Sequence, residues 1–390
     1  MLIKARWLFD GVSQPPVSDP IVETQDGRVV RVVAAEGVLS SEPVTDLGDV
    51  TLMPGLIDGH QHLGFDASSD PVATLMADSD AALLLRMRLA ALKALAAGIT
   101  TIRDLGDRSY LGVELRDWFR TGVEIGPEIL AAGPPITVSK GHCWFLGGEA
   151  DGIDGVRQAV RDHVARGVDL IKIMATGGNM TPTLGPHESQ YTLDEIRAAV
   201  EEAHAHGLLV AAHGHGTQGI ADALAAGVDS IEHCTFMNAD GVDSDNEVIG
   251  QLGRSQTFVS VSGGFLPSDL PPAFPEMAKR RDAIIANHRL LYESGARIVC
   301  GTDAGVTSAK PHDVLPYGLE MLSMIGMSNL EALRAVTSVA AQACGVADRK
   351  GAISAGMEAD LVAVGGNVVE DLAKIHDVVA VFRAGVSSLR

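Results

Sequence analysis

The chain has 390 residues, 46% of them hydrophobic, which is enough for a packed core divided over about two domains. Its formal net charge of -20 is spread along the sequence and repels phosphate backbones and acidic lipid surfaces, so we expect no nucleic-acid or membrane partner. The sequence has no run of about 18 apolar residues, which argues against a membrane-spanning helix.

The amino terminus lacks the apolar run and small-residue cleavage site of a signal peptide, and its pattern is typical of a strand. The four cysteines have no framework spacing; they are Cys143, Cys234, Cys300 and Cys344. Reduced thiols are the simpler interpretation of such scattered cysteines. We therefore expect a cytoplasmic protein.

Residues 1–52 contain short strand-like runs separated by turn signals. Asp26-Gly27 lies between the runs 21–24 and 28–33, and Asp-Gly between two such runs is a strong hairpin signal. So few strands bury little surface, so we expect this β unit to be incomplete on its own.

From Leu52 onward, strand-like runs alternate with helical stretches that end in glycine. A helix over 81–97 ends at Gly98, and the run 99–104 follows as a strand. The pair Thr192 and Glu195 forms a capping box that opens the next clear helix, which is followed by a strand over 208–213. Eight strand candidates alternate with helices in this way. The pattern predicts an α/β protein whose residues 53–349 form a (β/α)8 TIM barrel.

The β pattern returns near the carboxyl end. A capping box of Ser328 and Glu331 opens a helix that we predict to continue to about Cys344. Two strand-like runs follow at 360–364 and 378–382. The simplest way to bury them is against the N-terminal strands, which predicts a small β-sandwich domain built from both chain ends, residues 1–52 and 350–390.

Histidine and aspartate residues stand at the ends of several predicted barrel strands, where the reactive groups of such barrels collect. A single histidine on a strand is more often structural, but five such positions around one barrel mouth favour a metal site. Imidazole and carboxylate suit Zn, Mn, Fe or Co, with zinc as our default. The five predicted ligands are His60, His62, His213, His233 and Asp303.

Lys172 lies inside the apolar strand 170–174. A buried lysine must reach solvent, lose its charge or be chemically modified. Its ammonium form would repel metal cations, whereas a carbamate made from CO2 and the neutral amine is an anionic, bidentate bridge. We therefore expect two divalent metal ions bridged by carboxylated Lys172, with a hydroxide held between them.

These motifs resemble those of the metal-dependent amidohydrolase superfamily, in its prolidase and imidazolonepropionase-related branch, over nearly the whole chain. The similar segments are 53–63, 171–178, 211–215, 230–233, 301–305 and 351–361. The resemblance implies that His60 and His62 bind one metal with Asp303, that His213 and His233 bind the other, and that carboxylated Lys172 bridges them. Imidazolonepropionases resemble mononuclear enzymes without this lysine, so the chain looks more like the prolidase-type members.

The implied mechanism uses Asp303 as general base on the bridging water and as proton donor to the departing amine. His142 follows the third strand where this branch often has a Gly-Gly-His that contacts substrate, although Lys140 replaces the first glycine. His142 and His215 either contact the substrate or pack the loops. Arg108, Lys140 and His187 either pair with a substrate carboxylate or are solvated loop residues.

Most of the other polar residues near the strand ends and helix ends favour a structural role. We predict that Arg103 and Asp104 form a structural pair below the site. His204 and His206 occupy the last turn of a helix, where the dipole favours imidazolium. His312 is a weaker candidate for the rim of the barrel mouth.

We expect hydrolysis of a C–N amide bond in a small molecule, such as a dipeptide, as in prolidases, or an N-acyl amino acid. The alternative substrates are non-peptide: a cyclic amide, carbamate, phenylurea or lactone, since fold and metal do not set specificity. A third hypothesis is a catalytically silent scaffold. Such a protein would be expected to lack metal ligands, and all the predicted ligands are present in this sequence. We also expect a homo-oligomer.

Overall fold

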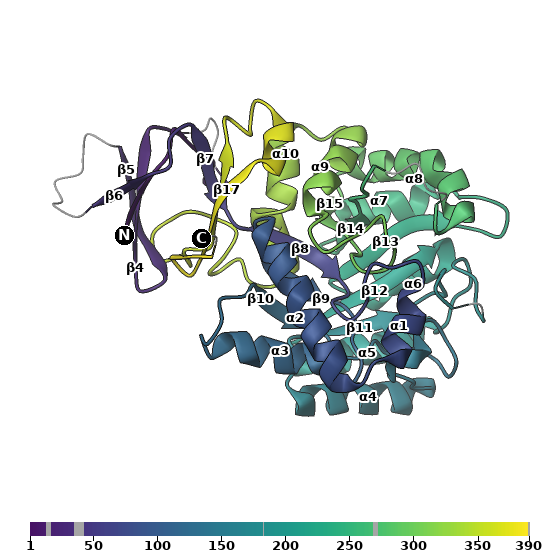
Figure 1. The fold of residues 1–390 in the computed structure, drawn as a ribbon. Coiled ribbons are helices and arrows are strands. Elements are labelled where there is room, and N and C mark those ends of the chain that lie inside the picture. Colours follow the sequence, from purple (N-terminus) through teal and green to yellow (C-terminus); the bar gives the residue numbers. More distant parts are fainter. Residues whose placement is uncertain (13–16, 35–42, 182, 268–271, 389–390) are drawn as a thin grey trace.

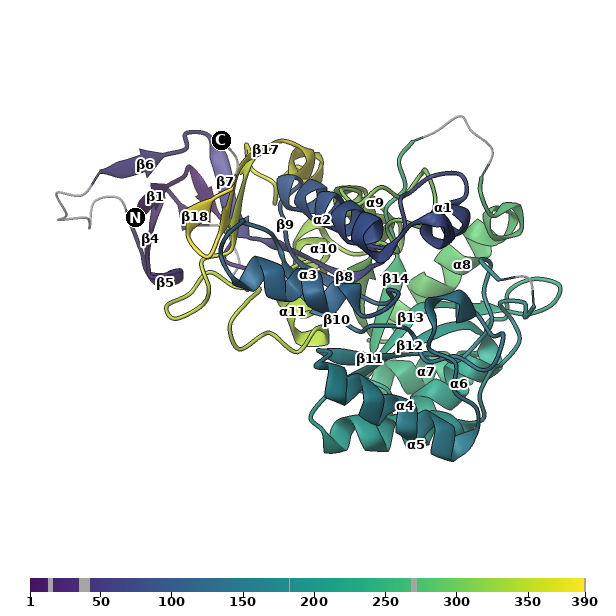
Figure 2. The ribbon, with the colours of Figure 1, turned by 60° about the horizontal axis from the view of Figure 1, so that its bottom comes forward.

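The structure is a computed structural model that describes residues 1–390 except 13–16, 35–42, 182, 268–271 and 389–390. The strands from both chain ends lie together at one end of the molecule, and the larger part consists of strands surrounded by helices (Figure 1, Figure 2). Within the described part of the chain, no helix is both long and apolar enough to cross a membrane.

Parallel strands form the centre of the larger part, in two sheets with the orders β10-β9-β8 and β11-β12-β13-β14-β15. Single parallel bridges connect the two sheets at both edges, Ile136 with Ile173 and Gln61 with Ala304. The strands are β8 (Leu56–Gln61), β9 (Ile99–Asp104), β10 (Glu128–Ala131), β11 (Leu170–Met174), β12 (Leu209–Gly216), β13 (Ser230–Met237), β14 (Phe258–Ser262) and β15 (Arg297–Gly301).

Helices follow these strands in the predicted alternation and lie outside them (Figure 1). The capping boxes of Thr192 with Glu195 and of Ser328 with Glu331 are both present. The helices are α1 (Pro71–Ala77), α2 (Asp80–Ala96), α3 (Leu111–Arg120), α4 (Gly152–Arg166), α5 (Leu193–Ala205), α6 (Thr217–Ala226), α7 (Asn246–Arg254), α8 (Pro275–Glu293), α9 (Leu315–Met324), α10 (Asn329–Ala335) and α11 (Ser338–Ala343), with 3-10 turns η2 (Trp144–Leu146) and η3 (Leu372–His376).

The predicted continuous helix from Ser328 to Cys344 is wrong, because the chain forms two helices, α10 and α11. Thr337 lies between them at φ -133, and its hydroxyl donates to the Leu333 carbonyl four residues earlier. The Val336 carbonyl accepts a hydrogen bond from the Ile57 amide of β8 at 2.8 Å. The backbone at the break is therefore used to hold the first parallel strand.

The smaller part contains a sheet of order β5-β4-β1-β6 and a sheet of order β18-β17-β16-β7-β2-β3. In the second sheet, Met53 of β7 pairs antiparallel with Val362 of β16, which joins the two ends of the chain. The strands are β1 (Leu2–Lys4), β2 (Trp7–Leu8), β3 (Val17–Ser18), β4 (Pro20–Gln25), β5 (Arg28–Ala34), β6 (Val44–Asp46), β7 (Val50–Pro54), β16 (Leu361–Gly365), β17 (Val378–Arg383) and β18 (Val386–Ser387).

The predicted hairpin between β4 and β5 is confirmed. Asp26 and Gly27 have φ of 51 and 76, the left-handed pair that a two-residue turn with the right twist requires. Side chains from both chain ends share one hydrophobic cluster, which includes Ile3, Leu52 and Phe382. The two terminal segments thus bury their apolar faces against each other.

A buried group of charges, which we call the junction cluster, joins the two parts of the molecule. At its centre the Lys350 amine contacts Glu128 of β10 at 2.9 Å and Glu358 at 2.7 Å, and it also contacts Asp360. Arg349 and Arg383 pair with the same carboxylates. Only 2% of the Lys350 side chain is exposed, so its charge is compensated by protein groups rather than by water.

Candidate metal centre

The predicted ligands converge on one cavity at the carboxyl ends of the parallel strands. The side chains that line it come from β8, β11, β12, β13 and the loops that follow the strands. They are His60, His62, His142, Cys143, Lys172, Met174, Asn179, Met180, His213, His215, His233, Phe274, Asp303 and Val306. The alternation of residues along β8 directs His60 and His62 to the same side, as their spacing predicted.

One group of possible ligand atoms is formed by His60, His62 and Asp303. The Nε2 atoms of the two histidines are 3.2 Å apart. Asp303 Oδ1 lies 3.5 Å from His60 Nε2 and 3.4 Å from His62 Nε2. Three donor atoms that face one point at these separations suit a single divalent ion.

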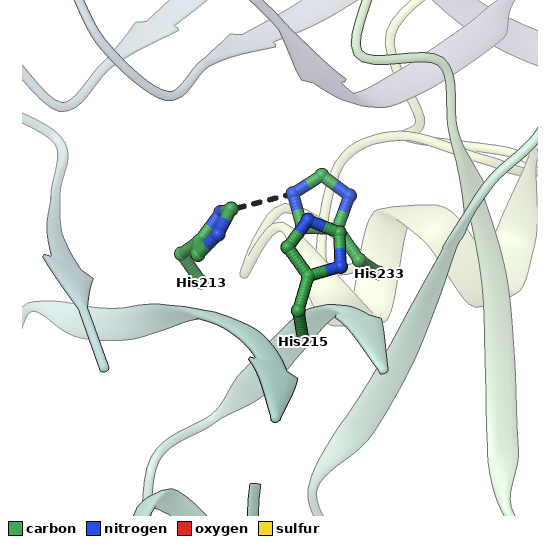
Figure 3. Close-up of side chains that lie close together, drawn as sticks. All are labelled: His213, His215 and His233. Carbon is green, nitrogen blue, oxygen red and sulfur yellow. Dashed lines mark hydrogen bonds between the residues drawn. The ribbon is translucent and has the colours of Figure 1, made fainter. Parts of the chain in front are cut away.

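A second group is formed by His213, His215 and His233 (Figure 3). His213 Nδ1 lies 3.0 Å from His233 Nε2, and the His215 ring stacks on the His233 ring at a centroid distance of 4.4 Å. From the sequence, only His213 and His233 of this group are predicted metal ligands. His215 nevertheless lies in the same group of possible ligand atoms.

The outer nitrogen of each predicted ligand histidine is held by the protein. His62 Nδ1 is 3.3 Å from the Gly106 carbonyl, His213 Nε2 is 3.1 Å from the Gly177 carbonyl, and His233 Nδ1 is 2.5 Å from the Ser262 hydroxyl. His60 Nδ1 lies 3.0 Å from Glu232 Oε2. Such contacts fix the ring orientation, so the inner nitrogens present their lone pairs to the cavity.

Burial keeps these histidines neutral, the form in which imidazole binds metals. It lowers the pKa of His60 to about 4 and holds those of His213 and His233 well below the ordinary range. Burial alone would raise the pKa of Asp303, but the neighbouring His62 and His60 hold it well below that of a free carboxyl. The donor set is therefore three neutral or anionic groups around each candidate position.

Lys172 lies among these ligands and is 1% exposed. Its amine has no hydrogen-bond partner among the described residues. Burial is the main cause that lowers the pKa of this amine to about 8. A buried ammonium without a partner is costly, so the surroundings of Lys172 favour its neutral amine over the charged form.

Two of the predicted ligands have strained backbones. Asp303 has φ 59 and His233 has φ 67, in the left-handed region that residues with a Cβ rarely adopt. Asp303 lies two residues beyond β15, where its amide donates to the His60 carbonyl at 2.7 Å. Strain of this kind is concentrated at functional sites, where the surrounding structure enforces it.

The five candidate substrate contacts divide into two groups. His142 and His215 line the cavity and are nearly fully buried. His142 fits because Gly178 faces it: a Cβ at that glycine would lie 2.3 Å from His142 Nε2. Burial lowers the pKa of His142 to about 3, and its Nδ1 has no hydrogen-bond partner among the described residues.

Lys140 and Arg108 are not among the side chains that line the described cavity. Lys140 is exposed, at φ 58. The Arg108 guanidinium donates to the carbonyls of Leu75 and Asp78 and to the Asp80 carboxylate, and so joins the end of α1 to the start of α2. His187 is exposed as well.

The other polar residues of the strand ends have structural contacts. His312 is buried against the Phe65 carbonyl and Gln61, and it is not among the side chains that line the described cavity. His204 pairs with Asp229 and His206 lies near Glu202, as expected for the end of α5. The predicted pairing of Arg103 with Asp104 is wrong, since adjacent strand residues point to opposite sides.

Arg103 instead binds Glu232, a residue that sequence reasoning missed. The guanidinium contacts Glu232 at 2.8 Å and the Gly59 carbonyl at 2.5 Å, and Glu232 reaches the outer nitrogen of His60. Burial alone would raise the pKa of Glu232, but Arg103 holds it well below the ordinary value. The feature of the sequence that could have indicated Glu232 is its position directly before the predicted ligand His233.

Lys310 was also missed, and it supports the ligands on the other side. Its amine donates to the Thr302 carbonyl at 2.5 Å and the Ser262 carbonyl at 3.3 Å, and lies 4.1 Å from the Phe265 ring. The amine thereby joins the ends of β14 and β15, next to Asp303. Only its position seven residues after Asp303 pointed to it in the sequence.

The chain is similar to several known proteins. The chain is similar to ochratoxinase from Aspergillus niger, with 30% identity over 82% of this chain and 71% of the relative, and to imidazolonepropionase from Deinococcus radiodurans, with 26% identity over 90% and 86%. Among solved structures, a Xaa-Pro dipeptidase with bound methionine has a TM-score of 0.86 and 30% identity, covering 99% of this chain and 98% of its own.

The structure of the A. niger ochratoxinase has a TM-score of 0.85 and 26% identity, covering 99% of this chain and 95% of its own. A sequence model described as the amidohydrolase family matches residues 51–387, which include every predicted metal ligand. The chain therefore belongs to the amidohydrolase family and is a hydrolase.

Proposed function

We propose that the chain is a two-metal hydrolase that cleaves a C–N amide-type bond in a small molecule. The observation that carries this proposal is the convergence of four anchored imidazoles, Asp303 and Lys172 on one cavity, where the Lys172 amine has no hydrogen-bond partner among the described residues. A structural polar cluster would satisfy its own members, and this one leaves its inner atoms facing a cavity.

His60, His62 and Asp303 would hold one ion, and His213 with His233 the other, with a Lys172 carbamate between them. His215 is near enough to the second group to assist it. Bound divalent ions, with zinc as our default, would polarise a carbonyl and acidify water. The amine of Lys172 is suited to carbamate formation because burial without a partner favours its neutral, CO2-reactive form.

The remaining chemistry belongs to the side chains of the cavity. Asp303, whose Oδ1 lies 3.5 Å from His60 Nε2 and 3.4 Å from His62 Nε2, takes a proton from the attacking water and delivers it to the departing nitrogen. His142, whose Nδ1 has no hydrogen-bond partner in the described part of the chain, is our candidate for contacting the substrate carbonyl oxygen. His215 is oriented by a contact of 2.9 Å between its Nδ1 and the Thr235 hydroxyl, which leaves Nε2 toward the substrate.

We interpret the larger part, residues 53–349, as a closed (β/α)8 TIM barrel. The two edge bridges and the outer helices support this interpretation. We interpret residues 1–52 and 350–390 as one β-sandwich domain, which the pairing of β7 with β16 supports. In this architecture the strand ends that carry the ligands lie around one mouth.

Dipeptides and N-acyl amino acids are the first substrates that the resemblance suggests. A second candidate is a non-peptide carbonyl compound, such as a cyclic amide, carbamate, phenylurea or lactone. The observation that favours this second candidate is the wall of the cavity, which offers apolar side chains rather than fixed cations.

The test combines metal analysis with turnover. We expect two metal equivalents per active chain, loss of amide hydrolysis on chelation and its recovery on adding Zn2+. Asp303→Asn is expected to lower kcat by about 10²–10⁴-fold while the protein retains part of its metal. Active protein with fewer than two metal equivalents, or unchanged turnover of the variant, would contradict the proposal.

A further inference from the structure

The cavity has an apolar wall next to its ligands. Cys143 and Met174 are buried there, Val306 follows Asp303 in the loop after β15, and Met180 and Phe274 are partly buried. Four of these side chains come from the loops after β10, β11, β14 and β15, and Met174 is the last residue of β11. An apolar group of the substrate would therefore be enclosed from several sides.

Fixed positive charge is missing from this wall. Among the described residues that line the cavity, none is an arginine, and Lys172 is the only lysine. The nearby Lys310 amine is occupied by the Ser262 and Thr302 carbonyls and by the Phe265 ring. The sequences of residues 182 and 268–271 contain no lysine or arginine.

The histidines of the cavity are not fixed cations. His142 and His215 are 5% and 4% exposed, and the Nδ1 atom of His215 contacts the Thr235 hydroxyl. Asn179 adds a neutral amide. Among the described residues, a substrate carboxylate held against this apolar wall would therefore meet no cationic side chain, and an unpaired buried charge is costly. The net charge of -20 adds a long-range repulsion.

We propose that the preferred substrate is an uncharged amide, carbamate or urea whose apolar amine-side group carries no carboxylate, in place of a dipeptide or N-acyl amino acid. This inference rests on the proposed hydrolytic function. In the reaction, water supplies OH to the carbonyl carbon and a proton to the nitrogen as the C–N bond breaks. The acid product is a carboxylic acid from an amide, a carbonic acid monoester from a carbamate or a carbamic acid from a urea, and the other product is an apolar amine.

A pair of compounds that differ only in the carboxylate tests the proposal: N-benzoyl-phenethylamine and N-benzoyl-L-phenylalanine. With the zinc-loaded enzyme, we expect kcat/KM to be at least tenfold higher for the compound without the carboxylate. An equal or higher value for N-benzoyl-L-phenylalanine would overturn the inference. If the loaded enzyme cleaves neither compound, the proposed function fails for these amides, and calorimetric dissociation constants of the same pair still decide the charge preference.

A charge introduced into the wall provides the second test. Met180→Arg places a cation beside the cavity and is expected to shift the ratio of the two kcat/KM values at least tenfold toward the carboxylate compound. Met180→Gln is the uncharged control of similar length and is expected to leave this ratio within about threefold. A ratio that moves equally in both variants would show that size, rather than missing charge, governs the preference.

Discussion

Two buried lysines in this chain have opposite surroundings. Lys350, in the junction cluster, contacts three carboxylates, whereas Lys172 in the cavity has no hydrogen-bond partner among the described residues. Both side chains are almost fully buried. Because an unpaired buried ammonium is costly, the protein compensates the lysine that joins its two parts and leaves the other available for chemistry.

Lys172→Met should have the largest effect on activity. Loss of the bridging group would remove at least one metal, and we expect kcat/KM to fall by about 10³-fold or more, the equivalent of several kcal/mol. The metal-free variant should unfold at the same urea concentration as the wild type or a higher one, because the substitution removes a buried amine without a partner. Metal analysis, kinetics and urea denaturation check the predicted loss of metal, the loss of kcat/KM and the unfolding midpoint. A variant that retains two metals and full turnover would contradict the proposed role of Lys172.

Lys350→Met should show the opposite pattern. Removing the central cation leaves Glu128, Glu358 and Asp360 close together and partly unpaired, so we expect the free energy of unfolding to fall by about 3–5 kcal/mol. The fraction that remains folded should bind metal normally, since Lys350 does not line the cavity. If this variant instead loses metal without losing stability, the junction cluster has a role in the active site.

Acid sensitivity sharpens the contrast further. Burial opposes ionisation of Glu128, but Arg349 and Lys350 outweigh it and lower its pKa from 4.5 to about 2. A lowered pKa in the folded state gives stability that is complete above pH 4.5 and is lost as the pH falls toward 2, about 3 kcal/mol in total. The stability difference between wild type and Glu128→Gln should therefore shrink between pH 5 and pH 2.5 in urea denaturation. The exposed pair of Glu276 and Lys279 provides the control, because Glu276→Gln should change stability little at any pH.

The features predicted correctly from the sequence are those that short segments determine. Alternation of apolar runs, capping boxes and the spacing of His60 and His62 all act within a few residues, so the parallel strands and the convergence of ligands could be inferred. The predictions that are wrong concern residues whose contacts are made with groups far away in the sequence. Arg103 binds Glu232, 129 residues away, rather than its neighbour Asp104, and β8 interrupts the helix at Val336. Arg108 was likewise misjudged because its guanidinium donates to Leu75 of α1 and Asp80 of α2, which lie earlier in the chain.

Glu232 offers the smallest and most specific test, because it is a buried charge that serves both kinds of role. It neutralises Arg103, as the carboxylates of the junction cluster neutralise Lys350, and it also faces the outer nitrogen of His60. Glu232→Gln keeps the shape and removes the charge that orients the ring and raises its basicity. We expect zinc affinity, measured by chelator competition, to fall about 10–100-fold.

Asp104→Asn is the matched control for this substitution. Asp104 is also a fully buried carboxylate, at the end of β9 beside the strand β8 that carries His60. Its side chain accepts from the Gly106 amide, and among the described residues no hydrogen bond or ion pair joins it to a predicted ligand histidine. We expect its zinc affinity to equal that of the wild type. Wild-type affinity in Glu232→Gln, together with lower stability, would mean that Glu232 is only the counter-ion of Arg103. A selective loss of affinity would instead mean that Glu232 uses its buried charge to prepare a ligand, as we propose that β11 uses the amine of Lys172.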